Sequence, residues 1–432
     1  MIARVSRILS RVANADIVRV FSLTAVSTLV KMLAGFVSIK VIAVILGPDG
    51  LALIGQLNNF STIIMAVASV GINNGITKYV AEYKANPSAF KNFVSTAYRI
   101  TIVGSVVSGL FMICFPGWLG RVLFKTTVYD YVFVIFGITI IFYAVNNLLL
   151  SVVNGLKQFK RFVWISIANS VGGLIYTILF VWSLGLRGAL ISFVTYQSVS
   201  LLITAFMLRR SEWFRWNNFR ERFSAPVARK YMQYTLMTLV SISVVPVSQL
   251  ILRGYVMTHI SELQAGWWEA MNRLSNMYLI VITSSFGIYY LPRLSELQTR
   301  TELRREILKA YGVIIPALVA GFILIYLCRM TVIRILFTPE FYPMEQLFAW
   351  QLSGDLFKIG SWLLAFLMLA KSRTLAFIST EIIFSGIYVG LGLFLIHLNG
   401  IVGLVQSYLV NYILYMGCMV VLFRKILFVR ER

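Results

Sequence analysis

The sequence predicts an all-α protein that crosses a membrane many times, because it is long, very apolar and sparsely charged. Its 432 residues are 59% hydrophobic and 13% charged, and the mean hydropathy is +0.82. A surface that faces water needs more charge than this composition supplies. About 20 apolar residues span a bilayer as a helix. Hydropathy predicts twelve such segments, at 18–46, 51–79, 93–115, 129–154, 162–184, 188–208, 231–258, 267–291, 308–328, 346–370, 374–397 and 401–423.

The predicted segments divide into two halves of six. We expect residues 1–208 and 231–432 to form two six-helix lobes, joined by a basic, aromatic amphipathic helix at 209–230 on the cytoplasmic side. The second segments of both halves end alike, in GITKYVAEY from Gly75 and GIYYLPRLSEL from Gly287. Because each half has an even number of spans, the halves are expected to be parallel repeats.

The net charge of +23 is distributed unevenly between the two sides of the predicted membrane. Most Lys and Arg residues lie in the termini and in the loops on the N-terminal side. Few lie in the opposite loops, namely Arg121, Lys125, Arg187, Arg329 and Arg334. By the positive-inside rule, both termini are cytoplasmic. The charge is therefore a signal of topology and of attraction to anionic lipids, and it does not indicate nucleic-acid binding.

The first predicted span carries two lysines. Lys31 lies about 13 residues into the span, roughly 20 Å deep at the helical rise, which is too deep for easy snorkelling. A role in a cavity or in substrate binding is favoured for Lys31, and a structural pair with an acid such as Asp355 is the alternative. Lys40 lies near the far end of the span, where snorkelling and a substrate role explain it equally well.

Polar residues also end the second span and interrupt later ones. Asn73, Asn74 and Lys78 interrupt an otherwise apolar helix, so they either face a polar cavity or hold helices together. Arg253 and Arg273 fall toward the external side of the seventh and eighth spans, where snorkelling is as good an explanation as substrate binding. Arg99 in the third span is open to the same two interpretations.

The helix expected at 347–370 carries an acid and a base near its middle. Asp355 and Lys358 are three residues apart, so they share a helix face and can pair. A charge at mid-membrane costs roughly 2.5 kcal/mol or more, so it faces a bundle interior, a watery cavity or another charge. Glu381, one to two turns into the eleventh span, is the second embedded acid. Because acids near lysines titrate together, Asp355 and Glu381 are candidates for coupling transport to protons or sodium.

The sequence carries no signature of an enzyme or of an ATP-driven pump. It has two histidines, and it shows no Ser/His/Asp order, metal-ligand cluster or Gly-rich nucleotide motif. We therefore expect no cofactor and no metal. What remains is an excess of embedded cations over acids, which favours an anionic substrate. A diphosphate fits, because Lys and Arg hold phosphate oxygens by charge-assisted hydrogen bonds.

Several stretches of the chain resemble one known family. They are TLVK at Thr28–Lys31, the GP turn at Gly47, NGITKYVAEY from Asn74, SSFGIYYLPRLSEL from Ser284 and LFAWQLSGDLFKIG from Leu347. Together they resemble the Wzx-type O-antigen translocases of the polysaccharide transport family, in the superfamily of multidrug, oligosaccharidyl-lipid and polysaccharide exporters.

The resemblance implies a V-shaped fold of two six-helix lobes and transport by alternating access. It also implies a flippase of the bacterial inner membrane, with a place in lipopolysaccharide or enterobacterial common antigen biosynthesis. Such a flippase moves an undecaprenyl-diphosphate-linked oligosaccharide, such as an O-antigen repeat unit, from the cytoplasmic to the periplasmic leaflet. The polymerase and the chain-length regulator of the same pathway are the implied partners.

Two other functions are compatible with the residues. A cation-coupled exporter of small drugs would share the fold, but it should have an acidic cavity, which the excess of Lys and Arg opposes. A membrane polymerase or ligase would be expected to carry a large external loop with catalytic groups, and the external connections here are short.

Overall fold

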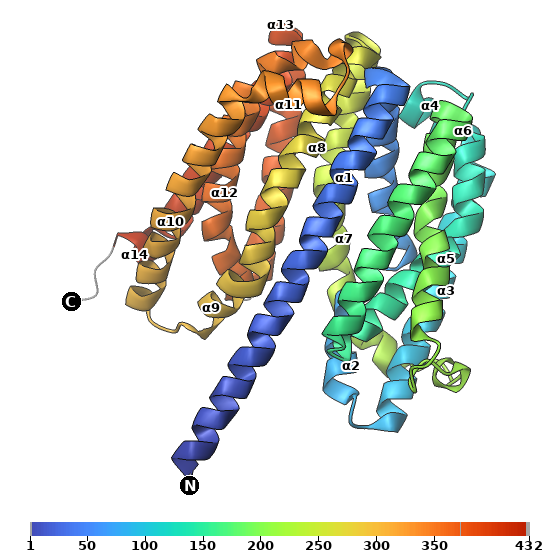
Figure 1. Cartoon of the computed structure of the whole chain (residues 1–432), viewed down its shortest axis with the longest axis vertical. Coiled ribbons are helices and arrows are strands. Elements are labelled where there is room, and N and C mark those ends of the chain that lie inside the picture. The colour runs from blue at the N-terminus through green and yellow to red at the C-terminus, as the bar shows by residue number, and fades with distance from the viewer. Residues whose placement is uncertain (1, 372, 429–432) are drawn as a thin grey trace. The chain divides into compact units, whose positions relative to one another are not determined.

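The computed structural model describes residues 2–371 and 373–428, and within these ranges the chain forms helices and turns without strands (Figure 1). Eight of the described helices are long and apolar enough to cross a membrane. Large apolar side chains stand on their surface, among them Trp182 and Leu375, each 81% exposed. An apolar surface of this kind is typical of contact with lipid. The expected class, an all-α polytopic membrane protein, is confirmed.

Three of these helices contain a glycine that the chain uses to change direction. They are α1 (Ile2–Ala68), α6 (Phe159–Leu208) and α13 (Thr374–Leu422), bent at Gly47, Gly185 and Gly400 with φ of 65°, 56° and 59°. A residue with a Cβ is strained at positive φ, so glycine is needed there. Each long helix is therefore two segments that meet at a sharp bend. The predicted number of twelve spans stays a prediction.

The bends in α6 and α13 share a motif. The first glycine of GLRG (185–188) and of GIVG (400–403) has positive φ, and the second lies against backbone. A Cβ on Gly188 would collide with the carbonyl of Phe180, and one on Gly403 with the carbonyl of Leu395. Both collisions involve the residue eight positions earlier. The two bends occupy matching places in the two predicted halves of the sequence, and the repeat itself stays a prediction.

The remaining elements are shorter or carry more charge. They are α2 (Asn73–Tyr83), α3 (Pro87–Cys114), α4 (Pro116–Phe124), α5 (Tyr131–Gly155), η1 (Trp216–Phe219), α7 (Ala225–His259), α8 (Glu262–Ser285), η2 (Phe286–Tyr290), α9 (Leu291–Glu296), α10 (Arg300–Leu327), α11 (Arg329–Leu336), η3 (Pro339–Leu347), α12 (Phe348–Ala370) and α14 (Arg424–Leu427).

The chain packs into two compact units that differ from the expected lobes in one segment. The first unit comprises Met1–Ser38, Ile64–Val122 and Thr126–Leu239, and the second comprises Ile39–Ile63, Leu123–Lys125 and Val240–Arg432. Residues 39–63, which follow the middle of α1, therefore pack with the later helices. Units defined by contacts need not coincide with the lobes of a membrane fold, so the lobes at 1–208 and 231–432 stay a prediction.

The first unit is built on α2, α3, α5 and α6. Ile72, Val94 and Leu148 are fully buried in its core. Gly109 of α3 and Gly137 of α5 face each other so closely that a Cβ on either would meet the carbonyl of the other. Small residues of this kind let membrane helices approach each other.

The linker at 209–230 is not the continuous amphipathic helix that we expected. Residues 209–224 form turns around the short 3-10 helix η1, and α7 begins at Ala225. Side chains of α3 satisfy the linker backbone, since Ser95 Oγ donates to the Glu221 carbonyl at 2.8 Å. These tertiary hydrogen bonds replace those that a helix would make within itself.

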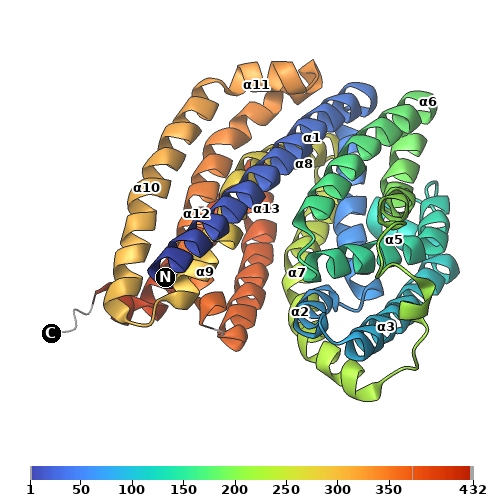
Figure 2. The same cartoon turned by 60° about the horizontal axis from the view of Figure 1, so that its bottom comes forward.

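The second unit is organised around α12, which lies beside α10 and α13 (Figures 1 and 2). Phe348, Ile359 and Leu363 of α12 are fully buried. The start of α8 packs against the bend of α1, where a Cβ on Gly266 would collide with the Pro48 backbone. Gln351 and Asp355 of α12 are buried as well, so these polar side chains lie against other parts of the protein.

Candidate functional site

The carboxylate of Asp355 lies at the centre of the second unit and is fully buried. It accepts hydrogen bonds from Ser275 Oγ at 2.7 Å, from Tyr408 OH at 2.8 Å and from Gln351 Nε2 at 3.4 Å, and also from the hydroxyl of Tyr278. These donors belong to α8, α12 and α13. Neutral donors therefore offset the desolvation of this acid and tie three helices to it.

Lys358, one turn further along α12, makes no ion pair with Asp355 in the described part of the chain. Its Nζ instead lies over aromatic rings, 5.2 Å from the centroid of Trp362 and 5.7 Å from those of Tyr408 and Tyr412. A cation over ring faces is attracted by their negative quadrupole. The shared helix face that the sequence predicts is present, but the acid and the base have different partners.

Lys358 and Glu381 line the same cavity, whose volume is about 80 Å³. The wall is formed by α7, α8, α12 and α13 and is rich in tyrosine and amide side chains. Within the described residues, neither Lys358 nor Glu381 makes an ion pair. The structure therefore brings two of the predicted site residues, Lys358 and Glu381, to one cavity. Asp355 does not line this cavity, but it accepts hydrogen bonds from Tyr408 and Ser275, which do.

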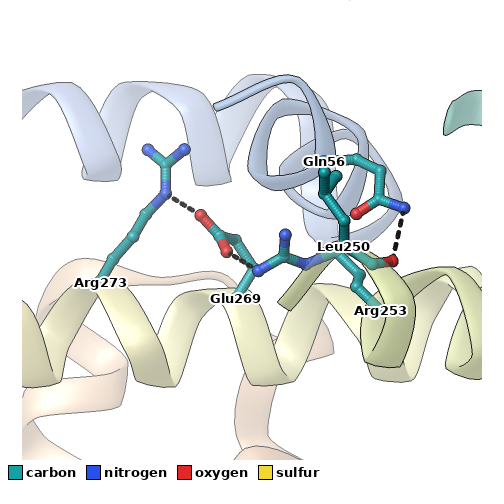
Figure 3. Close-up of polar contacts among 5 residues, drawn as sticks. All are labelled: Gln56, Leu250, Arg253, Glu269 and Arg273. Carbon is teal, nitrogen blue, oxygen red and sulfur yellow. Dashed lines mark hydrogen bonds and ion pairs between the residues drawn. The ribbon is translucent and has the colours of Figure 1, made fainter. Parts of the chain in front are cut away.

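Arg253 and Arg273 meet at a third acid, Glu269 (Figure 3). Arg253 Nη2 lies 2.5 Å from Glu269 Oε2, and Arg273 Nε lies 2.7 Å from Glu269 Oε1. The two guanidinium groups reach the carboxylate from opposite sides, one from α7 and one from α8. The three side chains form one ionic cluster with an excess positive charge, in which Arg253 and Glu269 are buried and Arg273 is partly exposed.

Arg253 is 1% exposed, so it does not snorkel toward the membrane surface. It also stacks on Trp268 at 4.9 Å, while its Nε and Nη1 have no hydrogen-bond partner. The segment of α1 at Gly55 and Gln56 covers the cluster, and Gln56 Nε2 donates to the Leu250 carbonyl at 3.2 Å (Figure 3). A side chain at Gly55 would overlap Glu269. Substrate binding by Arg253 and Arg273 stays a prediction.

The remaining predicted site residues lie on α1 and α2. Lys31 and Lys40 are exposed on α1, in the first and the second unit respectively. In the first unit, Asn73 Nδ2 is 3.4 Å from Ser69 Oγ, Asn74 is exposed, and Lys78 Nζ lies 5.2 Å from the ring of Tyr79. Their role in substrate binding stays a prediction.

Two features of this region were missed in the sequence. Glu269 and Arg273 are four residues apart on one helix, a spacing that indicates an ion pair. Tyr408, Tyr412 and Tyr415 recur at the spacing of one helix face, which could have indicated an aromatic wall.

Comparison with known proteins identifies close and distant relatives. Residues 17–298 match a family described as polysaccharide biosynthesis protein. The chain is 30% identical over 393 residues to the lipid III flippases of Escherichia coli (strain K12) and of Shigella flexneri, covering 91% of this chain and 94% of each relative.

The fold is shared with solved transporters. An inward-facing multidrug resistance MATE family transporter of the MOP superfamily superposes with a TM-score of 0.76 at 14% identity, covering 91% of this chain and 95% of that one. A MOP superfamily transporter from Pyrococcus furiosus gives a TM-score of 0.65 at 13% identity, covering 94% and 96%. These structures establish the fold, and the sequence match goes further: the chain belongs to the polysaccharide biosynthesis protein family.

Proposed function

We propose that the chain is a flippase that moves an undecaprenyl-diphosphate-linked oligosaccharide from the cytoplasmic to the periplasmic leaflet of the bacterial inner membrane. The observation that carries this proposal is the 30% identity, over 91% of the chain, to relatives named lipid III flippase. The cargo is lipid III of enterobacterial common antigen or an O-antigen repeat unit. The protein is a transporter and not an enzyme.

The polar groups inside the helical units suit this cargo. A charged, hydrated head group cannot cross hydrocarbon unaided, so a flippase must supply polar partners within the membrane. Lys31, Lys40 and Lys78 are candidates for the diphosphate, as is Arg273, whose side chain is 19% exposed. If the Arg273 side chain leaves Glu269 to bind the anionic diphosphate, Glu269 keeps its ion pair with Arg253, so the acid is not left unpaired.

Transport proceeds by alternating access, and its direction is set by coupling or by consumption of the product. Asp355 and Glu381 are the acids through which a proton or sodium gradient would act. A bound ion shifts the balance between two conformations only if it binds them with different affinities. Release in the periplasmic leaflet leaves the product where a polymerase and its chain-length regulator act.

The test is transport of lipid III by the purified protein in proteoliposomes, with and without proton and sodium gradients. We expect lipid III to reach the opposite leaflet faster than in protein-free vesicles, and Lys31→Ala and Asp355→Ala to abolish this while the protein remains in the membrane. An O-antigen repeat unit on the same carrier is the parallel substrate. If no lipid-linked oligosaccharide moves while a cationic dye does, the protein is a drug exporter and the proposal fails.

A further inference from the structure

The cavity beside Lys358 has the composition of a site for a sugar ring. Its wall combines aromatic rings, amides and hydroxyls: Trp362, Phe384, Tyr388, Tyr408, Tyr412 and Tyr415 with Gln249, Asn272, Asn276 and Asn411. Sugar rings present C–H faces to aromatic rings and a rim of hydroxyl groups to polar side chains, so this mixture matches both parts.

The aromatic wall is fixed in place by its own contacts. Tyr408 and Tyr412 meet edge to face at 4.8 Å, as do Phe384 and Tyr415, while Tyr388 lies 6.0 Å from Tyr408. Tyr408 is also held by its hydrogen bond to Asp355. Edge-to-face pairs are the favoured geometry of aromatic rings, so the wall does not have to rearrange to receive a ligand.

Buried polar atoms in this wall lack partners in the protein. Asn411 is 6% exposed, yet its Oδ1 makes no hydrogen bond, and neither does Asn272 Nδ2. Most buried polar side-chain atoms in proteins are paired. An amide donor and an amide acceptor are together complementary to sugar hydroxyls, each of which both donates and accepts.

The charges in the cavity oppose a diphosphate as its occupant. One cation, Lys358, and one acid, Glu381, line it, so the cavity lacks the positive excess that a diphosphate requires. A lysine and a carboxylate can instead donate to and accept from the hydroxyls of a neutral sugar.

We propose that this cavity in the second unit is the subsite for an uncharged sugar ring of the cargo. The ring lies against Trp362 and the tyrosines, and Asn272, Asn411 and Tyr415 hold its hydroxyls. The inference rests on the proposed function, because the sugar arrives attached to the polyprenyl diphosphate. Asp355 acts here as a positioning residue, since it holds Tyr408 and Ser275 without lining the cavity itself.

The experiment measures how much the sugars add to binding. Wild-type protein in nanodiscs is titrated with undecaprenyl diphosphate and with lipid III, and the ratio of the two Kd values is taken. We expect lipid III to bind more tightly. Asn411→Leu with Tyr415→Phe should reduce that ratio about tenfold or more, the scale of one or two lost hydrogen bonds, and leave the Kd of undecaprenyl diphosphate unchanged.

Tyr311→Phe is the matched control, because its hydroxyl donates to the Gly360 carbonyl at 2.5 Å and lies outside the cavity. Unchanged binding of undecaprenyl diphosphate shows that each variant is folded. If the double variant keeps the wild-type ratio, or if wild type binds both lipids equally, the inference is wrong while the flippase proposal stands. If wild type binds neither lipid, the proposed function itself fails. If the double variant keeps the wild-type ratio of Kd values but its transport of lipid III no longer depends on sodium or protons, the cavity is a cation site instead.

Discussion

At the scale of single residues, the second unit separates charges that hold structure from charges that are available to a ligand. Glu269 pairs with the buried guanidinium of Arg253 and with the partly exposed guanidinium of Arg273, and Asp355 is surrounded by hydroxyl and amide donors. Lys358, in contrast, has aromatic rings around it and no ion pair with a described residue. Removing a structural charge should lower stability, whereas removing an available charge should lower function.

Glu269→Gln tests the structural side of this division. Removing one partner of a buried ion pair costs about 3–5 kcal/mol, because the other charge stays buried and uncompensated. We expect a loss of unfolding free energy of that order, measured by thermal unfolding in detergent. The control is Glu345→Gln: Glu345 pairs with Arg329 at 2.7 Å but is 38% exposed, so about 1 kcal/mol or less is expected. Equal effects of the two substitutions would contradict a buried cluster.

Lys358→Met tests the available charge. The substitution keeps the length and the apolar stem of the side chain while removing an ammonium group from an enclosed position. We expect the melting temperature to stay unchanged. The substitution removes a cation–π attraction of about 2 kcal/mol or less, but it also removes the unfavourable free energy of burying a charge, and the two effects offset each other. Transport of lipid III in proteoliposomes should fall about tenfold or more, as expected for a lost charge-assisted hydrogen bond of roughly 1.5–3 kcal/mol. A fall in stability with unchanged transport would assign Lys358 a structural role.

The charged members of the site could be predicted from the sequence, and the uncharged ones could not. Asp355, Lys358 and Glu381 stand out because a charge in an apolar helix is costly and therefore rare. Tyr408 and Trp362 do not stand out, because aromatic residues are equally common in cores and at membrane interfaces. The ion pair of Arg253 with Glu269 could not be predicted, because it depends on which helices pack together. The periodicity of a sequence does not contain that information.

At the scale of elements, glycines decide where the long helices bend and how closely they pack. Hydropathy locates the helices because every backbone polar group in lipid must be satisfied within its own segment. It does not show that α6 and α13 continue as helix on both sides of a bend. The basic, aromatic composition of 209–230 predicted a helix there, but residues 209–224 form turns, and side chains of α3 pair with the Glu221 carbonyl and the Ser224 amide.

Gly403→Ala tests the bend in α13. The added Cβ would collide with the carbonyl of Leu395, and backbone cannot move aside as a flexible side chain can. We expect a loss of about 1–3 kcal/mol in unfolding free energy, the scale of overpacking, measured by thermal unfolding. Gly417→Ala in the same helix is the control, because a Cβ there meets nothing within 4 Å. That change should be neutral or stabilising by up to about 1 kcal/mol. If both substitutions behave alike, the close approach at the bend is absent.

At the scale of the whole molecule, the sequence carries topology information that contacts between helices do not contain. The net charge of +23 is concentrated in one set of loops, and the positive-inside rule assigns that set to the cytoplasm. Packing within each unit is indifferent to this assignment, because turning the whole molecule over in the membrane changes no internal contact. The orientation of the molecule in the membrane is therefore predicted from the charge distribution alone.

Single-cysteine labelling checks the topology directly. Cys114, Cys328 and Cys418 are first replaced by Ala, and a cysteine is then introduced in place of Lys125 or of Lys157, which lie in loops expected on opposite sides. In intact spheroplasts, a membrane-impermeant maleimide should label the cysteine at 125 and should reach the one at 157 only after the membrane is permeabilised.

C-terminal fusions give an independent readout: green fluorescent protein should fluoresce, and alkaline phosphatase should be inactive. Labelling of position 157 in sealed spheroplasts, with an active phosphatase fusion, would place both termini outside. The topology predicted from the charge distribution would then be wrong, and the cytoplasmic leaflet would meet the opposite face of the protein.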